Sequence, residues 1–362
     1  MEKLKIAFLG LDHVHASQMF FCMNTASDKV EFIGMADFLS KDKEVVDEKV
    51  SRNCVKQMRD AVKLYYDYEE LLSKKPDMVL INSDVKSHAD CAIEVLKRDL
   101  NVVVEKPMAF DMADAKRMYK AAKESEGELI INWPIAWFPA FNKAKELADS
   151  GIIGEVLRVQ YRSPSTRGPY RLDQFTPKEL SKMWWYQSGR GGGSIFDYAG
   201  YGCVLATWIT NMTAKSVYGL KKNFFLPFSD VEDYSVFTID FGDKVGLIEG
   251  SWSTMNNGEI ATGPVVYGTE GVIVADRFDP IVKVYKDLKP YQPSPAPTEV
   301  FECPPQTNAD MAKNLIEHFT LGAPLHELLT LDFNMRAASA LDAGCRSCES
   351  GVSEKAEDPF MI

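Results

Sequence analysis

The stretch Asn101-Val102-Val103-Val104-Glu105-Lys106-Pro107 joins an apolar run to a charged pair and a proline. Apolar runs without polar alternation are typical of strands that are buried on both faces of a parallel sheet. In open α/β sheets, ligands bind in the crevice outside the carboxyl ends of the strands. Lys106 is therefore placed for chemistry, although a strand that simply ends in polar residues before a proline-initiated turn explains the tripeptide equally well.

The residues on either side of this strand alternate short apolar runs with stretches of helical spacing. Four further strands are predicted, over Lys5–Leu9, Glu31–Ala36, Met78–Asn82 and Leu129–Asn132. Helical stretches lie between the strands, over Gln18–Asn24, Lys41–Met58, Tyr68–Ser73 and His88–Lys97. Alternation of this kind is the pattern of βαβ units and a parallel sheet. We therefore expect an α/β Rossmann-type nucleotide-binding domain over residues 1–131.

From Gly154 onward the sequence predicts alternating strands without long helices between them. These strands are Val156–Tyr161, Ala214–Leu220, Ser235–Phe241, Val245–Ser253, Val265–Gly268 and Val272–Ala275. Such alternation indicates an antiparallel sheet with one buried face. Residues 132–362 are therefore expected to form an α+β domain with a mostly antiparallel open sheet, for substrate binding and oligomerisation.

Three segments near the C-terminus complete this second domain. The proline-rich stretch Lys289–Pro305 is predicted to be an extended loop, because prolines interrupt regular structure. Helical spacing resumes over Asp310–Thr320 and Phe333–Ala343. The last helix, over about residues 331–349, is expected to pack back towards the first domain.

Length and composition place the chain among globular proteins. Its 362 residues are too many for one ordinary core, and 46% hydrophobic with 26% charged residues is close to average usage. The net charge is −11 and the basic residues are scattered, which argues against nucleic acid as a partner. There is neither an apolar signal-peptide core nor a run long enough to span a membrane. We therefore expect a cytoplasmic protein without a membrane partner.

The cysteines and histidines give little indication of a metal. Seven cysteines, an odd number spread along the chain, favour reduced thiols over a disulfide framework. Cys345 and Cys348 form a C-x-x-C, but they fall in a helical pattern and have no second pair. His13 and His15 form an H-x-H without a third ligand nearby in the sequence. No metal site is predicted.

The turn after the first strand is Gly10-Leu11-Asp12-His13-Val14-His15, where a dinucleotide-binding protein would carry G-x-G-x-x-G. Gly10 supplies the glycine needed for the tight turn, whereas Asp12 and His15 stand in the other two glycine positions. On these residues alone, an ordinary strand-to-helix turn with Asp12 as the helix N-cap fits better. If the turn binds a dinucleotide, the expected contacts are Gly10, Leu11, Asp12, His13 and Val14.

Asp37 follows the second predicted strand directly. An acid about 20 residues beyond the turn accepts hydrogen bonds from the adenosine ribose of NAD and repels the 2′-phosphate of NADP. The sequence therefore favours NAD as the cofactor, although Lys41 and Lys43 lie close enough to weaken the preference.

Several segments, in this order and spacing, resemble the glucose-fructose oxidoreductase, inositol dehydrogenase and MocA (Gfo/Idh/MocA) oxidoreductases. Residues 81–88 are similar to the family's strand-T-P-N-x-x-H segment, conservatively at Ser83 and identically at His88, but not at Asp84 or Val85. The other matching segments are Glu105-Lys106-Pro107 (E-K-P), Leu147–Gly154, Gly191–Asp197 (G-G-G-x-L-x-D) and Tyr267–Gly271. The resemblance covers nearly the whole chain.

This resemblance implies roles for particular residues. Lys106 would contact both the nicotinamide ribose and the substrate, and Asp197 would orient Lys106 or bind a substrate hydroxyl, or else cap a helix. Family members often carry an acid/base histidine four residues beyond this aspartate. Tyr201 stands there instead, as in glucose-fructose oxidoreductase-like and dihydrodiol dehydrogenase-like members. A nearby ammonium such as that of Lys106 would favour the ionised phenol, and a packed helix aromatic is the alternative.

Further contacts are expected on both sides of the reaction. Cofactor contacts are implied for Ser83, Asp84, His88, Glu105 and Lys106. Aromatic faces next to polar groups suit carbohydrate-like ligands, and Arg167 could bind an anionic substituent, although core packing and loop solvation are the alternatives. The candidate substrate-binding residues are Trp133, Trp185, Tyr186 and Arg167.

The sequence therefore predicts an NAD(H)-dependent oxidoreductase that acts on a secondary alcohol or carbonyl of a sugar, a cyclitol or a related polyol. One alternative is an NAD-dependent glycosidase that oxidises its substrate transiently, and it would accumulate no NADH. Another is a non-catalytic nucleotide-binding sensor or scaffold, which the loss of two glycines from the turn suggests. An open sheet face makes a homodimer or homotetramer the expected assembly.

Overall fold

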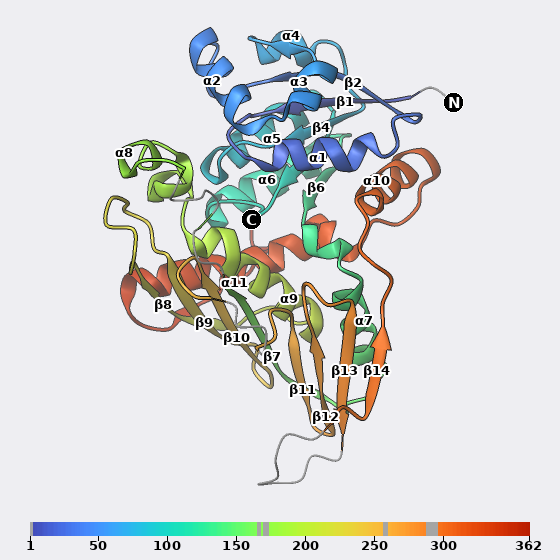
Figure 1. Cartoon of the computed structure of the whole chain (residues 1–362), viewed down its shortest axis with the longest axis vertical. Helices are drawn as coiled ribbons and strands as arrows, with labels where there is room; N and C mark the ends of the chain where they lie inside the picture. The colour runs from blue at the N-terminus through green and yellow to red at the C-terminus, as the bar shows by residue number, and fades with distance from the viewer. Residues whose placement is uncertain (1–2, 165–167, 169–173, 256–259, 287–295) are drawn as a thin grey trace. The chain divides into compact units, whose positions relative to one another are not determined.

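The computed structural model describes residues 3–164, 168, 174–255, 260–286 and 296–362. The chain divides into two compact units, which Figure 1 shows as ribbons. The first unit holds Met1–Trp133, Thr307–Met335 and Ile362, and the second holds Pro134–Gln306 and Arg336–Met361. Residues 307–335, which the sequence assigned to the second domain, belong to the first unit because the helix within them packs against the first helix of the chain.

The first unit contains a parallel sheet of six strands, five of which the sequence predicts. Its order is β3-β2-β1-β4-β5-β6, so the connections run in opposite directions on the two sides of β1. The strands are β1 (Leu4–Leu9), β2 (Val30–Ala36), β3 (Leu64–Tyr65), β4 (Met78–Ile81), β5 (Asn101–Glu105) and β6 (Leu129–Asn132). The sequence does not predict β3, because a two-residue edge strand has no period to detect.

Burial explains why the strands of this sheet are so uniformly apolar. Successive side chains of a strand point to opposite faces of the sheet. All four residues of β4 are fully buried, as are Ile6 to Leu9 of β1, so both faces of the sheet are covered. The Rossmann-type fold class predicted from the sequence is therefore confirmed.

Helices connect and cover these strands. They are α1 (His15–Asn24), α2 (Lys43–Asn53), α3 (Lys56–Ala61), α4 (Tyr68–Leu72), α5 (His88–Leu96), α6 (Met112–Glu124) and α10 (Ala309–Leu321), with short 3₁₀ turns at Val85–Ser87 and Glu327–Leu329. The charged stretch predicted as one helix is two, because Cys54 and Val55 have extended backbone angles. Asp42 caps α2 by accepting hydrogen bonds from the amides of Glu44 and Val45.

The second unit contains a nine-stranded, mostly antiparallel sheet of order β14-β13-β12-β11-β7-β10-β9-β8-β15. Of its strand pairs, β7 and β10 run parallel. The strands are β7 (Val156–Pro164), β8 (Ser216–Lys222), β9 (Tyr234–Asp240), β10 (Val245–Ser251), β11 (Val265–Gly268), β12 (Gly271–Ala275), β13 (Ile281–Lys286), β14 (Glu299–Glu302) and β15 (Glu354–Lys355). This confirms the predicted α+β class.

The prediction of an extended loop over Lys289–Pro305 is wrong at β14. This strand pairs with β13 through its main chain while most of its side chains are exposed, so its sequence carries no alternating pattern. Residues 287–295 lie outside the described part of the chain.

One face of this sheet is covered by helices. They are α7 (Pro139–Asp149), α9 (Gly200–Thr210) and the part of α11 (Leu331–Ser350) that belongs to the second unit. The second unit also contains the short helix α8 (Pro177–Leu180). Nearly every residue of α9 is buried, and α9 contacts β7 and β10. The side chains of Tyr218 and Leu220 on β8 are 48% and 39% exposed, and they alternate with the buried positions of that strand.

None of the described helices combines the length and the apolar character needed to cross a bilayer. All seven cysteines are free thiols, which agrees with the reduced state expected from the sequence.

Gly10 is predicted to be essential for the packing of β1 against the end of β4. Its φ is +78°, and a Cβ there would lie 2.7 Å from the backbone nitrogen of Ser83. Gly322, in the same unit, has φ +67° and nothing within 4 Å of such a Cβ. Gly322→Ala should therefore lose only the left-handed backbone preference, about 1–2 kcal/mol, and Gly10→Ala about 2 kcal/mol more through overlap. Urea unfolding measures both losses, and equal losses would contradict the packing.

Candidate functional site

The turn after β1 lies at the point where the strand order of the first sheet reverses. The backbone N–H groups of Asp12 and His13 donate to the carbonyl of Asn82, at 3.1 and 2.9 Å, just after β4. The N–H of Gly10 donates to the carbonyl of Ala36 at the end of β2. The turn thus connects the carboxyl ends of the strands on both sides of β1, the place where open α/β sheets bind ligands.

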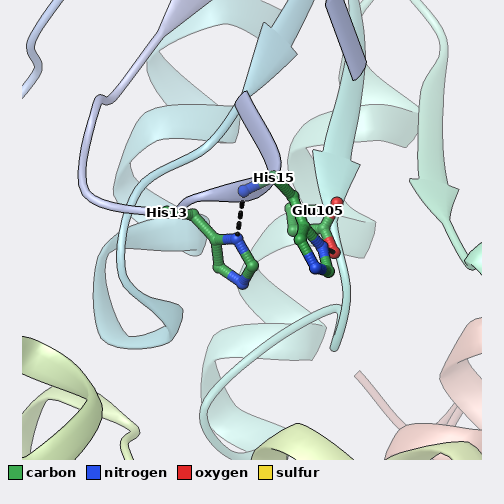
Figure 2. Close-up of side chains that lie close together, drawn as sticks. All are labelled: His13, His15 and Glu105. Carbon is green, nitrogen blue, oxygen red and sulfur yellow. Dashed lines mark hydrogen bonds and ion pairs between the residues drawn. The ribbon is translucent and has the colours of Figure 1, made fainter. Parts of the chain in front are cut away.

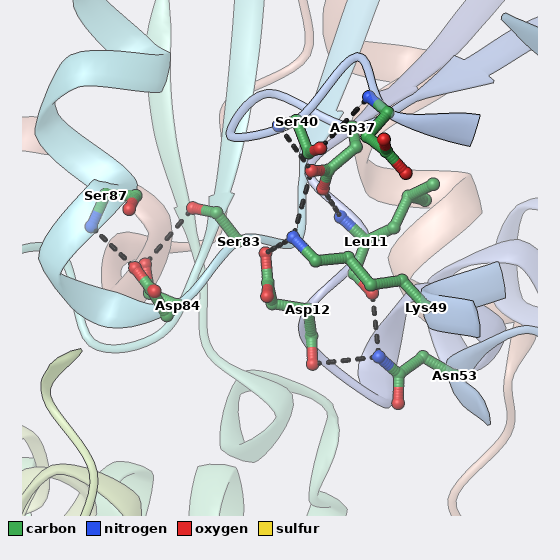
Figure 3. A network of polar contacts seen from close by, with 10 residues as sticks. Leu11, Asp12, Asp37, Ser40, Lys49, Asn53, Ser83, Asp84 and Ser87 are labelled. Atoms are coloured by element: carbon green, nitrogen blue, oxygen red, sulfur yellow. Dashed lines mark hydrogen bonds and ion pairs between the residues drawn. The ribbon is translucent and has the colours of Figure 1, made fainter. Parts of the chain in front are cut away.

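Asp37 lies at this edge, 1% exposed, and is surrounded by donors (Figure 3). Its carboxylate accepts hydrogen bonds from the N–H groups of Leu11 and Ser40, at 3.3 and 2.9 Å. The ammonium of Lys49, on α2, lies 2.9 Å from Asp37 Oδ2 and 3.0 Å from Asp12 Oδ2. Burial lowers the pKa of Lys49, but Asp12 and Asp37 outweigh this and raise it. Lys49 is therefore a cation shared by two carboxylates.

The structure excludes Asp12 as the N-cap of α1. The N-cap position is occupied by Val14, which makes no capping hydrogen bond through its side chain. Asp12 instead pairs with Lys49, because α2 brings the ammonium to the turn.

Asn53 is the second contribution of α2 to the turn. Its Nδ2 donates to the carbonyls of Leu11 and Asp12, at 2.7 and 3.0 Å, and the residue is 6% exposed. Lys49 and Asn53 are four residues apart and so share one face of the helix. Neither residue is predicted from the sequence, because their partners in the turn lie 37 to 42 positions away and the helix is rich in charged residues.

At the end of β5, Glu105 is a fully buried carboxylate with several partners. His15 Nδ1 lies 2.8 Å from one carboxylate oxygen, and Asn132 Nδ2 donates to the other at 3.1 Å. Burial raises the pKa of Glu105, but His15 and Lys106 lower it below its usual value. Lys106 is itself 1% exposed. The first unit thus holds a buried carboxylate and a buried ammonium on neighbouring residues at the carboxyl end of β5.

Glu105 also supplies the third group that the H-x-H motif lacks in the sequence. Candidate ligand atoms of His13, His15 and Glu105 all lie within 4.8 Å of one another (Figure 2). The N–H of His15 donates to His13 Nδ1 at 3.0 Å, however, which leaves the proton of a neutral ring on Nε2. A protonated Nε2 cannot ligate a metal.

The charge state of His13 supports the same conclusion. Burial first, and then the charges of His15, Lys106 and His88, hold the pKa of His13 well below its usual value. The neutral ring therefore offers a hydrogen-bond donor at Nε2, which suits a ligand oxygen better than a cation.

The residues after β4 hold the turn that follows β5. His88, which is fully buried, lies with Nδ1 2.9 Å from the carbonyl of Pro107. Burial lowers the pKa of His88, so the neutral ring donates to this carbonyl. Asp84 accepts a hydrogen bond from the N–H of Ser87 at 2.9 Å, and Ser83 Oγ donates to the carbonyl of Asp84 at 3.1 Å.

Two buried side-chain oxygens at this edge test whether a dinucleotide fits. Asn82 Oδ1 and Asn132 Oδ1 have no hydrogen-bond partner within the described residues. Buried acceptors of this kind are rare in folded proteins and call for a donor. They lie just after β4 and at the end of β6, where ribose hydroxyls or a carboxamide of a dinucleotide would supply N–H and O–H donors. With the acid Asp37 and the donor His13, the residues fit such a ligand.

In the second unit, a glycine run positions Asp197. Gly191 and Gly193 have φ of +79° and +105°, and a Cβ on Gly193 would overlap the carboxylate of Glu232. Glu232 accepts a hydrogen bond from the N–H of Ile195 at 2.8 Å. The run continues into a single π-helical turn, Ile195–Ala199, and then into α9.

Asp197 lies within this π-helical turn and accepts a hydrogen bond from Trp252 Nε1 at 2.9 Å. It does not cap a helix, because the N-cap positions are those of Ser194 and Ala199. Tyr201, in the first turn of α9, is partly exposed.

Arg277 is a charged neighbour that the sequence does not predict. Burial lowers the pKa of its guanidinium, but Tyr161 and Tyr201, with Tyr198 and Asp197, raise it overall. A cation that acts on Tyr201 is thus present within the second unit itself. Lys106, the cation that the sequence suggested for this role, belongs to the first unit.

The candidate substrate-binding aromatics Trp133, Trp185 and Tyr186 are buried. Trp133 Nε1 donates to Asn334 Oδ1 at 2.6 Å within the first unit. Trp185 stacks on Trp184 with ring centroids 3.9 Å apart, and the Tyr186 ring lies next to those of Phe228 and Trp252. Arg167 lies outside the described residues.

Comparison with known proteins identifies related domains in both halves of the chain. Residues 4–132 match a family model described as the oxidoreductase family with an NAD-binding Rossmann fold (GFO_IDH_MocA). Residues 141–274 match the GFO/IDH/MocA C-terminal domain.

Relatives and solved structures are similar to the chain at low identity. Inositol 2-dehydrogenase of Salmonella typhimurium is 25% identical over 190 residues, which cover 50% of this chain and 54% of the relative. Trans-1,2-dihydrobenzene-1,2-diol dehydrogenase of Xenopus laevis is 24% identical over 61% of this chain and 62% of the relative. The matches thus span little more than half of these relatives. The crystal structure of an oxidoreductase from Thermotoga maritima shares the fold, with a TM-score of 0.76 and 18% identity over 98% of this chain and 99% of that one.

Glu232 is predicted to make stability depend on pH. Burial raises its pKa from 4.5 to about 7. The folded state then binds the proton of Glu232 more tightly than the unfolded state does. The free energy of unfolding should therefore be higher at low pH and fall by up to about 3 kcal/mol as the pH rises from about 4.5 to about 7. Glu232→Gln keeps the acceptor for Ile195 and should remove this loss.

The measurement is urea unfolding between pH 4 and pH 8. Glu299→Gln, an exposed glutamate on β14 of the same unit, controls for the loss of one charge and should keep the wild-type profile. Parallel profiles for wild type and Glu232→Gln would show that the pKa of Glu232 is the same in the folded and unfolded states, which would contradict the prediction.

Proposed function

Because this chain belongs to the Gfo/Idh/MocA oxidoreductase family, we propose that it is an NAD(H)-dependent dehydrogenase or reductase of CH–OH groups. Its substrate would be a secondary alcohol, or the corresponding carbonyl, of a sugar, a cyclitol or a related polyol. The names of the inositol and diol dehydrogenases among its relatives support this substrate class.

The observation that carries the proposal is the buried Glu105–Lys106 pair at the carboxyl end of β5. A lysine with 1% exposure is rare unless its charge is compensated, and Glu105 provides that compensation. The carbonyl of Pro107, held by His88, fixes the turn in which Lys106 lies. A buried ammonium at a ligand-binding edge suits the polarisation of a substrate oxygen.

The first unit carries the NAD-binding fold, and its residues suggest how the cofactor would be held. Asp37 would accept hydrogen bonds from the hydroxyls of the adenosine ribose, and the turn Gly10–Val14 would face the pyrophosphate. Ser83, Asp84, His88 and Glu105 would line the nicotinamide half. When bound, NAD supplies the carbon that accepts or returns a hydride.

The same residues favour NAD over NADP. Asp12, Asp37 and Lys49 together carry two negative charges and one positive charge. The 2′-phosphate of NADP would therefore meet a net negative group at Asp37. Lys49 does not reverse this preference, because both carboxylates already share its charge.

Different side chains of this chain would stabilise the substrate oxygen and transfer its proton. Lys106 would hold the substrate oxygen and stabilise negative charge on it, and Tyr201 would move the hydroxyl proton as general acid or base. Asp197, fixed by Trp252, would accept a hydrogen bond from a substrate hydroxyl. The Arg277 guanidinium would favour the ionised form of Tyr201.

A substrate screen with Lys106→Ala tests this proposal. Wild type incubated with NAD and a panel of polyols and sugars should accumulate NADH, detected by its absorbance. Lys106→Ala should bind NAD measurably but lose at least about 100-fold in turnover, as expected for a catalytic electrostatic group. Lys86→Ala, which removes a surface lysine paired with Asp114 in the same unit, should turn over normally.

Three outcomes of these measurements would contradict the proposal. Retained turnover in Lys106→Ala would exclude the lysine as the catalytic group. Conversion of a glycoside by wild type without net NADH would indicate the transient-oxidation glycosidase instead, and no NAD binding at all would indicate a sensor or scaffold.

Tyr201→Phe should change the pH dependence of turnover. If the phenol moves the proton, its removal abolishes the corresponding ionisation from the profile of kcat against pH and lowers kcat by about 10²–10⁴-fold. Tyr198→Phe is the matched control, since Tyr198 lies one helical turn earlier with its ring centroid 6.5 Å from that of Tyr201. An unchanged profile for Tyr201→Phe would assign the proton to another group.

A further inference from the structure

We propose that Lys49 is a positioning residue for the dinucleotide. Its ammonium neutralises and restrains the carboxylate of Asp12, so that the turn can bind a dinucleotide without its second glycine. The inference rests on the proposed function, because it concerns the binding of the same cofactor. It explains how a turn that keeps only the first glycine of its motif can still accept a pyrophosphate.

Asp12 creates a problem for such a ligand. The second glycine of a dinucleotide-binding turn lets the backbone approach the pyrophosphate closely. Asp12 occupies that position with a carboxylate that is 5% exposed. An uncompensated carboxylate there would repel a ligand that carries two negative charges.

Lys49, on α2, compensates the charge of this carboxylate. Its ammonium lies 3.0 Å from Asp12 Oδ2 and 2.9 Å from Asp37 Oδ2, and its side chain is 16% exposed (Figure 3). The ammonium thus holds the Asp12 carboxylate towards Asp37 and reduces the negative charge of the turn. Because the three groups are largely removed from water, their interaction is screened less than that of a surface pair.

Asn53 restrains the main chain of the same turn. Its amide donates to the carbonyls of Leu11 and Asp12, which turns these oxygens towards α2. The N–H groups of Asp12 and His13 are bound to the carbonyl of Asn82 on the other side. Both the backbone and the side chain of Asp12 are therefore fixed before any ligand binds, and the face of α2 that carries Lys49 and Asn53 does this.

The test is a double-mutant cycle on NADH affinity. The variants are Lys49→Met, Asp12→Asn and the double variant, and NADH binding is followed by nicotinamide fluorescence at constant ionic strength. Lys49→Met should weaken binding by at least about tenfold, because the Asp12 carboxylate loses the ammonium that it shares with Asp37. Asp12→Asn should bind NADH at least as tightly as wild type. The double variant should return to within about threefold of Asp12→Asn, since the repelling carboxylate is then absent.

Lys43→Met on the same helix is the matched control. Lys43 pairs with Asp47 on the exposed side of α2 and is 70% exposed, so its loss should leave NADH affinity unchanged. The thermal unfolding temperature of each variant without ligand provides a second measurement. If Lys49→Met does not fold, Lys49→Gln takes its place in the cycle, since its amide can still donate to one carboxylate.

The outcomes separate this inference from the proposed function. If Lys49→Met weakens binding equally in the wild-type and Asp12→Asn backgrounds, or not at all, Lys49 is only a structural ion pair and the inference fails. If wild type itself does not bind NADH, the proposed function fails. Loss of affinity that Asp12→Asn rescues is the result expected from the charges of the turn.

Discussion

Two hydrogen bonds, from the N–H groups of Asp12 and His13 to the carbonyl of Asn82, join the turn after β1 to the end of β4. They form where the strand order of the first sheet reverses, so they connect elements whose crossover connections run in opposite directions. Gly10 allows this approach, since any side chain there would overlap Ser83. The positions of Asp37, of His13 and of the groups after β4 all depend on this contact.

Two buried ionic groups flank the joined turn. On one side, Lys49 is shared between Asp12 and Asp37, and on the other, Glu105 is held by His15 and Asn132 next to Lys106. In each group the buried charges have partners of opposite charge or hydrogen-bond donors, and buried charges are stable only when they are paired in this way. A ligand with a negative pyrophosphate and a polar ring thus meets charges that are already oriented, and need not reorganise them.

The sequence predicts the parts of this arrangement that depend on local pattern. Apolar runs indicate β1, β2, β4, β5 and β6, and the residues that follow these strands include Asp37 and Lys106. The contacts of Lys49 with Asp12, and of His15 with Glu105, join positions 37 and 90 residues apart, and no local pattern encodes them. The edge strand β14 was missed for a related reason, because main-chain pairing leaves no trace in exposed side chains.

The central claim is that the carboxyl edge of the first sheet binds NAD although its turn keeps one glycine of three. Isothermal titration calorimetry of the purified protein with NAD and NADP tests it most directly. The arrangement of Asp37, Asp12 and Lys49 predicts saturable binding of one NAD per chain, with NADP at least about tenfold weaker. Absence of saturable binding, or tighter binding of NADP, would contradict the claim.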